Sequence, residues 1–126
     1  MNTIKQLLDA KGHDVWAIEP GDSVYDALTL MAEKEVGALL VLEEGKLVGI
    51  ISERDYARKV ILKGKFSQDT PVREIMTPRV IYVRPEQTVE ECLALMTEHR
   101  IRHLPVLADE QLGGVVSIGD LVKAIM

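Results

Sequence analysis

The sequence has a single cysteine, few aromatic residues and no long hydrophobic run. One cysteine, Cys92, cannot form an internal disulfide, and its place on an apolar helical stripe indicates a buried, inert thiol. Aromatic residues make up only 4% of the chain, so we expect an aliphatic core. No apolar run approaches the roughly 18 residues of a membrane-spanning helix, and the N-terminus lacks the apolar region of a signal peptide. We therefore expect a cytoplasmic protein that does not enter a membrane.

Basic charge and catalytic motifs are also scarce. The chain has 15 Lys and Arg against 20 Asp and Glu, a net charge of −5, which argues against a surface that binds nucleic-acid phosphates. His13, His99 and His103 do not have metal-ligand spacing, so we expect no metal site. No nucleophile–base arrangement and no P-loop is present, so we expect no catalytic residues and no enzyme.

What the chain does contain is an internal repeat. At an offset of 65 residues, Pro20–Asp55 aligns with Pro85–Asp120 without a gap, and 13 of the 36 positions are identical. Two copies are too few for a solenoid, which needs about three or more units. The 126 residues, 47% of them hydrophobic and 28% charged, instead suit a globular pair of half-domains related by a pseudo-twofold axis.

Each copy has the pattern of a βαββα unit, with apolar residues at helical spacing between short apolar runs. A short amphipathic segment precedes each copy, at residues 4–8 and 72–76. In the first copy the pattern predicts strands at 15–18, 38–42 and 47–52 and helices at 24–31 and 53–62. In the second copy it predicts strands at 80–83, 104–107 and 112–117 and helices at 89–96 and 118–125.

These elements predict an α/β (α+β) fold of two pseudo-twofold-related βαββα repeats packed sheet to sheet. We place repeat 1 at residues 1–62, a polar linker at 63–70 and repeat 2 at 71–126. One such unit exposes a face of its small sheet and is barely stable alone, so we expect the copies to bury these faces against each other. The pseudo-symmetry then predicts two clefts at the seam.

The residues at this point resemble a known family, the tandem CBS domain pair or Bateman module, over almost the whole chain. The similarity rests on the doubled unit, on Val72-Arg73-Glu74-Ile75-Met76-Thr77-Pro78, on His103-Leu104-Pro105-Val106, and on Gly49–Asp55 with its counterpart Gly114–Asp120. The resemblance implies a regulatory module that binds AMP, ADP, ATP, NAD or S-adenosylmethionine. It also implies a homodimer, because many members assemble into a disc of four repeats.

Ser52-x-x-Asp55 and Ser117-x-x-Asp120 have two interpretations. A serine followed three residues later by an acid, at the start of a helix, is typical of a capping box. The same geometry offers a phosphate the free N–H groups of a helix N-terminus, and the carboxylate can accept two ribose hydroxyls. In the family, the matching Asp binds ribose and the matching Ser or Thr lies near phosphate. Both interpretations can hold for the same residues.

The resemblance also places the apolar walls of each site on the opposite repeat. The first predicted site comprises Ser52, Arg54, Asp55, Arg79, Val80, Ile81, Tyr82, Ile101, Arg102 and His103. The second comprises Asp14, Val15, Trp16, Val36, Gly37, Ala38, Ser117 and Asp120. The alternative for the apolar members, such as Val80 and Trp16, is an ordinary core position.

Charge makes the two predicted sites unequal. Arg54, Arg102 and His103 belong to the first site, whereas glycine or alanine stands at the matching positions of the second. Arginine is well shaped to bind phosphate, so we expect the first site to hold the phosphorylated end of a nucleotide more tightly. Lys11 and His13 partly compensate in the second site. Arg58 and Lys59 suit a solvated helix face, or, for Arg58, a contact with a second phosphate.

The sequence therefore favours a non-catalytic module that binds an adenine nucleotide (AMP, ADP, ATP or NAD) between two repeats and signals to a separate regulated protein. The alternative is a dimeric scaffold for protein interactions without a nucleotide ligand. An exposed apolar face on the helices at 24–31 or 89–96 would favour that alternative.

Overall fold

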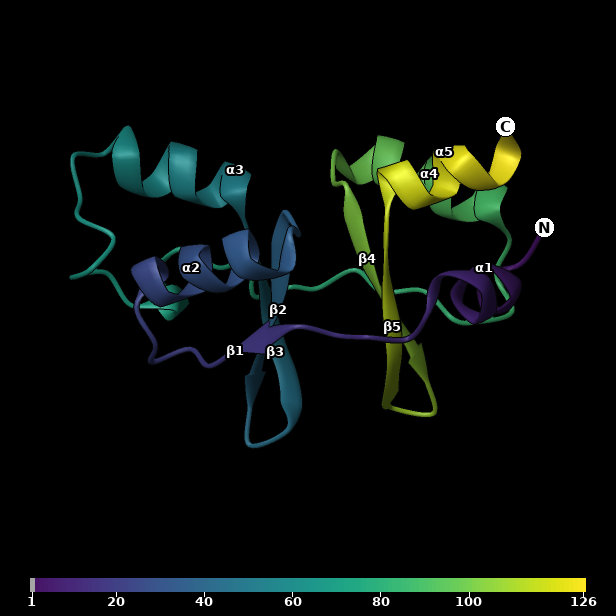
Figure 1. Cartoon of the computed structure of the whole chain (residues 1–126), viewed down its shortest axis with the longest axis horizontal. Coiled ribbons are helices and arrows are strands. Elements are labelled where there is room, and N and C mark those ends of the chain that lie inside the picture. The colour runs from purple at the N-terminus through teal and green to yellow at the C-terminus, as the bar shows by residue number, and fades with distance from the viewer. Residues whose placement is uncertain (1) are drawn as a thin grey trace. The chain divides into compact units, whose positions relative to one another are not determined.

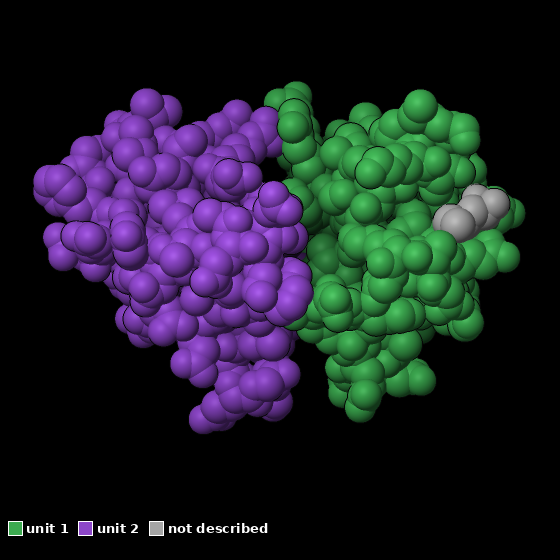
Figure 2. Space-filling model, in the orientation of Figure 1, with its two compact units in different colours: residues 1–15, 81–126 green, residues 16–80 purple. Residues whose placement is uncertain are grey.

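The computed structural model describes residues 2–126, and they form two compact units (Figures 1 and 2). Unit 2 is the continuous stretch Trp16–Val80, and unit 1 combines the N-terminal residues up to Val15 with Ile81–Met126. Each unit carries a small sheet and helices, so the predicted mixed α/β class is confirmed. Sheet-to-sheet packing of the repeats stays a prediction. No helix within residues 2–126 is both long and apolar enough to cross a membrane.

Unit 2 contains a three-stranded sheet in the order β1-β2-β3. Strand β1 pairs parallel to β2, and β2 pairs antiparallel to β3 with Ala38 opposite Ser52. The unit's elements are β1 (Ala17–Ile18), α2 (Val24–Lys34), β2 (Ala38–Glu43), β3 (Lys46–Ser52), α3 (Glu53–Tyr56), the π-helical turn η1 (Ala57–Ile61) and the 3₁₀ turn η2 (Val72–Glu74).

Unit 1 repeats this plan with a two-stranded antiparallel sheet. Its strands pair with His103 opposite Ser117, the counterpart of Ala38 opposite Ser52 in unit 2. The unit's elements are α1 (Ile4–Lys11), α4 (Val89–His99), β4 (His103–Ala108), β5 (Gln111–Ser117) and α5 (Ile118–Ile125).

The long helix of each unit begins at a side-chain cap and buries one apolar face. Ser23 accepts a hydrogen bond from the Asp26 amide (3.0 Å) at the start of α2, and Thr88 caps α4 in the same way. A capped N–H stabilises the first turn, and apolar residues three and four apart then share one side of the helix. In α2 these residues are Val24, Ala27 and Met31, and in α4 they are Val89, Cys92 and Met96.

The strand predicted at residues 80–83 is wrong, because only Val83 forms an isolated bridge, with Val106. The physical reason lies in the neighbouring strand. In unit 2 the Leu40 amide donates to the Trp16 carbonyl (3.1 Å) and extends the pairing of β1. The residue equivalent to Leu40 in unit 1 is Pro105, which has no N–H to donate. The strand predicted at 15–18 is likewise shorter, at Ala17–Ile18.

The helix predicted at residues 53–62 also differs, because it is α-helical only as far as Tyr56 and continues as a π-helical turn. The Leu62 amide donates to the carbonyl of Ala57, five residues earlier (3.1 Å). Val60 is buried in this π-helical turn. The matching helix predicted at residues 118–125 is confirmed in full by α5.

The segment that precedes each repeat packs with the other repeat. Ile4, Leu7 and Leu8 of α1 are buried in the core of unit 1, beside residues of the second repeat. Val72 and Ile75 are buried in the core of unit 2, beside residues of the first. The packing units therefore divide the chain differently from the predicted repeat boundaries at 1–62 and 71–126, which stay a prediction for the repeats themselves.

Candidate functional site

The strand β3 ends at Ser52, which is also the N-cap of α3. The Asp55 amide donates to the Ser52 hydroxyl oxygen (3.2 Å), and the Asp55 carboxylate Oδ2 accepts from the Ser52 amide (2.9 Å) and hydroxyl (3.1 Å). This reciprocal bonding is a capping box, so the structural interpretation of the motif is confirmed. The functional interpretation stays a prediction.

The same box recurs at the end of β5 in unit 1. The Asp120 amide donates to the Ser117 hydroxyl oxygen (3.1 Å), and the Ser117 amide donates to Asp120 Oδ2 (2.8 Å). Both units thus hold a serine hydroxyl and a partly buried carboxylate at the junction of a strand and a helix. A helix start of this kind carries partial positive charge, and the carboxylate adds a hydrogen-bond acceptor beside it.

The neighbouring strand supplies the residues nearest to each motif. In unit 2 the Glu53 amide donates to the Gly37 carbonyl (3.0 Å), which places Gly37 and Ala38 beside Ser52. In unit 1 the Ile118 amide donates to the Arg102 carbonyl (2.9 Å), and His103 lies opposite Ser117.

The predicted site of Ser117 contains Gly37 and Ala38, and the predicted site of Ser52 contains Arg102 and His103. Each unit by itself places these pairs beside the other motif. Both predicted sites draw residues from the two units, so their grouping stays a prediction.

The other predicted wall residues are divided between the units. Trp16 and Val36 are partly buried against the core of unit 2, and Ile101 and Ile81 are partly buried against that of unit 1. Tyr82, which lies outside the helices and strands of unit 1, is 49% exposed. Arg54 lies in α3, between Ser52 and Asp55. The other predicted members lie where the chain passes from one unit to the other: Asp14 and Val15 end the N-terminal part of unit 1, and Arg79 and Val80 end unit 2.

Each motif carboxylate is paired with a lysine. In unit 2 the Lys59 ammonium lies 3.1 Å from Asp55 Oδ1 and donates to the Ile75 carbonyl (2.9 Å). In unit 1 the Lys11 ammonium forms an ion pair with Asp120 and donates to the Val115 carbonyl (2.7 Å). The two lysines do not occupy equivalent positions in the repeat, and they come from different elements.

Lys59 is predicted from the sequence to lie on a solvated helix face, and its pairing with Asp55 was not predicted. The i,i+4 spacing of Asp55 and Lys59 is a signal that was available. No local spacing connects Lys11 with Asp120, although Lys11 is among the residues predicted to contribute to that site.

The charge states in unit 1 follow from these contacts. Burial opposes the charged form of Asp120, but hydrogen bonds from Lys11 and Ser117 outweigh it and hold the pKa of this carboxyl below its ordinary value. Burial lowers the pKa of His103, and the nearby Lys11 and Arg102 charges lower it further. The lowered pKa favours the neutral form of His103 at pH 7 in unit 1, and its place in the first predicted site stays a prediction.

Two further residues bear on the chemistry of the site. The Lys34 ammonium lies 4.5 Å from the ring centroid of Trp16, so one face of the indole already contacts a cation. Cys92 is fully buried, and burial raises the pKa of its thiol to about 11, as expected for an inert core cysteine.

Among the described residues, no group of three or more His, Cys, Asp or Glu is placed to hold a metal ion.

Comparisons with known proteins identify the family. The CBS domain family model matches residues 8–62 and again residues 72–126. A CBS-domain protein of Burkholderia ambifaria, described as a putative signal-transduction protein, is 53% identical and superimposes with a TM-score of 0.96 over 98% of this chain and 93% of its own. The mitochondrial CBS domain-containing protein CBSX3 of Arabidopsis thaliana is 43% identical over 98% of this chain, which spans 65% of that protein.

A third relative was solved with ligands. The CBS domain pair of the protein MJ0100, in complex with 5′-methylthioadenosine and S-adenosyl-L-methionine, is 25% identical, with a TM-score of 0.85 over 98% of this chain and 94% of its own. Two matches of the family model together cover most of the 126 residues. The resemblance drawn from the sequence motifs is thereby confirmed, and this chain belongs to the CBS domain family, of which it carries two tandem domains.

Proposed function

We propose that this chain is a non-catalytic regulatory module whose two CBS domains bind an adenosine-containing nucleotide and signal to a separate partner protein. The observation that carries this proposal is the duplicated serine–aspartate box, which presents a hydroxyl and a carboxylate at the start of α3 and again at the start of α5. A carboxylate can accept both hydroxyls of a ribose, and a helix start attracts phosphate.

The ligand class draws support from the family. The MJ0100 domain pair was solved with two adenosine compounds, 5′-methylthioadenosine and S-adenosyl-L-methionine. Adenine requires a flat apolar slot, and the predicted wall residues Val80, Ile81, Val15 and Trp16 supply apolar surface. AMP, ADP, ATP and NAD share the adenosine group, so this module is proposed to bind one of them with residues drawn from both repeats.

The absence of catalysis belongs to the same proposal. Both motif hydroxyls already accept a capping hydrogen bond, and the Cys92 thiol has a raised pKa, the opposite of an activated nucleophile. The proposed partners are a nucleotide, a second copy of the chain and a regulated protein. We further propose a cytoplasmic location, although the Arabidopsis relative is named as mitochondrial.

A thermal-shift panel with AMP, ADP, ATP, NAD and S-adenosylmethionine tests the proposal. A ligand present at about 100 times its dissociation constant stabilises a protein by about 2.7 kcal/mol, which corresponds to a rise in Tm on the order of 10 °C here. We expect a rise with at least one compound and its loss in the double variant Asp55→Ala/Asp120→Ala. The absence of any shift with every adenosine compound would overturn the proposal.

One observation favours the second candidate function, a dimeric interaction scaffold. That observation is not on the helices at 24–31 and 89–96, because their apolar faces are buried. Helix α5 instead exposes Ile118 (40%), Val122 (40%) and Ile125 (54%), which share one face. A Val122→Asp variant that loses self-association but keeps the ligand-induced rise in Tm would separate assembly from nucleotide binding.

A further inference from the structure

The outer edge of the sheet is held differently in the two units. In unit 2 the segment that follows η2 pairs with β3 through its backbone: the Ile50 amide donates to the Thr77 carbonyl (3.0 Å), and the Thr77 amide donates to the Ile50 carbonyl (2.9 Å). Backbone amide and carbonyl groups do not titrate, so this attachment does not depend on pH.

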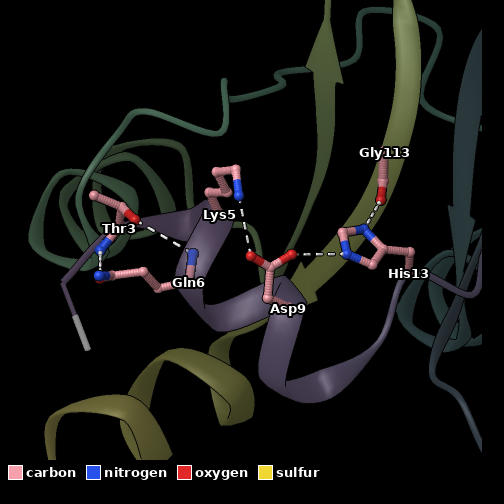
Figure 3. Close-up of polar contacts among 6 residues, drawn as sticks. All are labelled: Thr3, Lys5, Gln6, Asp9, His13 and Gly113. Atoms are coloured by element: carbon pink, nitrogen blue, oxygen red, sulfur yellow. Dashed lines mark hydrogen bonds and ion pairs between the residues drawn. The ribbon is translucent and has the colours of Figure 1, made fainter.

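In unit 1 the equivalent positions are Gly12 and Val115, and side chains make the attachment. The Lys11 ammonium donates to the Val115 carbonyl (2.7 Å). His13 Nδ1 lies 2.8 Å from the Gly113 carbonyl, as Figure 3 shows. The Gly12 amide instead donates back to the Leu8 carbonyl (2.7 Å). Two ionisable side chains thus occupy the place that a backbone pair fills in unit 2.

The surroundings of His13 select its charged form. Its Nδ1 faces the Gly113 carbonyl, and its Nε2 lies 3.2 Å from the Asp9 carboxylate (Figure 3). A carbonyl and a carboxylate only accept, so both contacts are hydrogen bonds only when both ring nitrogens carry a proton. The contact with Gly113, followed by the one with Asp9, raises the pKa of His13, and the nearby Lys5 charge opposes the rise.

The remaining contacts confine any opening to the end of α1. Ile4 and Leu7 are buried in the core of unit 1, so the start of the helix is anchored. Leu8 packs against β5, where a Cβ added at Gly114 would lie 2.9 Å from Leu8 Cδ2. From Asp9 to His13 the attachment depends on exposed or half-exposed polar side chains. Segments with few buried contacts open locally at low free-energy cost.

We propose that Lys11 and His13 form an ionisable clasp that holds the C-terminal end of α1 on β5, and that loss of the His13 proton loosens this clasp. Lys11 also pairs with Asp120, so opening of the clasp removes the cation from that carboxylate. If Asp120 binds ribose, a point that rests on the proposed function, the clasp connects pH with the state of the ligand site.

The direction of the pH effect follows from the raised pKa of His13. The stabilisation that the His13 contacts give to the folded state is fully present below the ordinary histidine pKa of about 6.5. It is lost as pH rises through the raised pKa that His13 has in the folded protein. Contacts between exposed charges are weak, so we expect a change of about two- to fivefold in local opening.

Amide hydrogen exchange of the ligand-free protein, followed by NMR at pH 5.5 and pH 8.0, tests the clasp. After correction for intrinsic exchange rates, protection of the Gly12 amide should fall about two- to fivefold at the higher pH, while protection of the Thr77 amide stays constant. His13→Gln should abolish the pH dependence at Gly12, whereas the matched variant His99→Gln, at an exposed position, should retain it.

A second pair of variants tests the connection to Asp120 without any ligand. Asp120→Asn should lower Gly12 protection, and Asp55→Asn should not. A pH-independent Gly12 amide in the wild-type protein, a retained pH dependence in His13→Gln, or a His13 pKa at or below its ordinary value would each overturn the proposal. Because these measurements use no nucleotide, failure of the clasp proposal can be distinguished from failure of the proposed nucleotide binding.

Discussion

Lys11 and Asp120 are 109 positions apart in the sequence and form an ion pair in unit 1. The pair attaches the end of α1 to the start of α5, and the same ammonium donates to the Val115 carbonyl. In unit 2 the carboxylate equivalent to Asp120, that of Asp55, instead pairs with Lys59 from the next turn of its own helix. The two units therefore pair equivalent carboxylates with lysines from different elements.

Replacement of Lys11 by methionine should raise the pKa of Asp120, since burial then acts without the opposing lysine hydrogen bond. In the wild-type protein the charged Asp120 carboxylate stabilises the folded state at pH values above its unfolded pKa of about 3.8. This stabilisation is lost as pH falls through the lower pKa that Asp120 has in the folded state. The Lys11 side chain is 38% exposed, so we expect a loss of only about 0.5–1 kcal/mol at pH 7. Urea unfolding at pH 7 and pH 3 measures it, with the exposed Lys46→Met as control; an equal difference at both pH values would contradict the assignment.

Gly49→Ala should destabilise unit 2, because an added Cβ would lie 2.6 Å from Met76 Sδ and 3.1 Å from the Thr77 carbonyl oxygen. Forced overpacking of this kind costs about 1–3 kcal/mol. The matched variant Gly113→Ala, whose Cβ would make only an ordinary contact of 3.7 Å with the Val106 carbonyl, should change stability much less. Chemical denaturation compares the two, and equal stabilities would show that the close approach at Gly49 is unimportant.

Ser23, Ser52 and Ser117 are all N-caps, but only the last two belong to the proposed ligand motifs. Loss of a cap costs about 1 kcal/mol, so Ser23→Ala and Ser117→Ala should lower stability by similar amounts. Only Ser117→Ala and Ser52→Ala should weaken binding of AMP more than binding of adenosine, because the hydroxyl is proposed to contact phosphate. Calorimetric titration of both ligands measures this difference. If Ser23→Ala lost as much AMP affinity as Ser52→Ala and Ser117→Ala, all three serines would act only as helix caps.

Cys92 should react slowly with a thiol reagent in the folded protein. Burial raises the pKa of the thiol to about 11, so at pH 8 its thiolate fraction is on the order of 100-fold below that of a free cysteine. Labelling should accelerate to the rate of a model thiol in urea, in parallel with the loss of helical circular dichroism. Rapid labelling under native conditions would mean that the core around α4 opens readily.

His103 and His13 should affect stability in opposite directions as pH falls. The pKa of His103 is lowered, so the unfolded chain binds the proton more readily, and stability should decrease below a pH of about 6.5. His103→Gln should remove this contribution, whereas His13→Gln should remove a contribution of the opposite sign. Denaturation midpoints between pH 7.5 and pH 5.5 report both, and a steeper acid loss in His103→Gln would contradict the argument.

The sequence alone determined the parts of this protein that depend on local pattern. A repeat at an offset of 65 residues, with apolar residues three and four apart, predicted α2, α4 and α5. The two serine–aspartate motifs predicted where a strand meets a helix, because a capping box involves residues only three positions apart. The family could likewise be inferred from short motifs that recur in order.

The tertiary structure decided what depends on partners distant in the sequence. Pro105 prevents the pairing that its counterpart Leu40 allows, so the strand expected at 80–83 is reduced to one bridge. Packing of α1 with the second repeat brings Lys11 to Asp120 and His13 to Gly113, at separations of 109 and 100 positions. The local conformational propensity of the sequence cannot predict such contacts, because they form only when the buried side chains of α1 fix the position of its polar end.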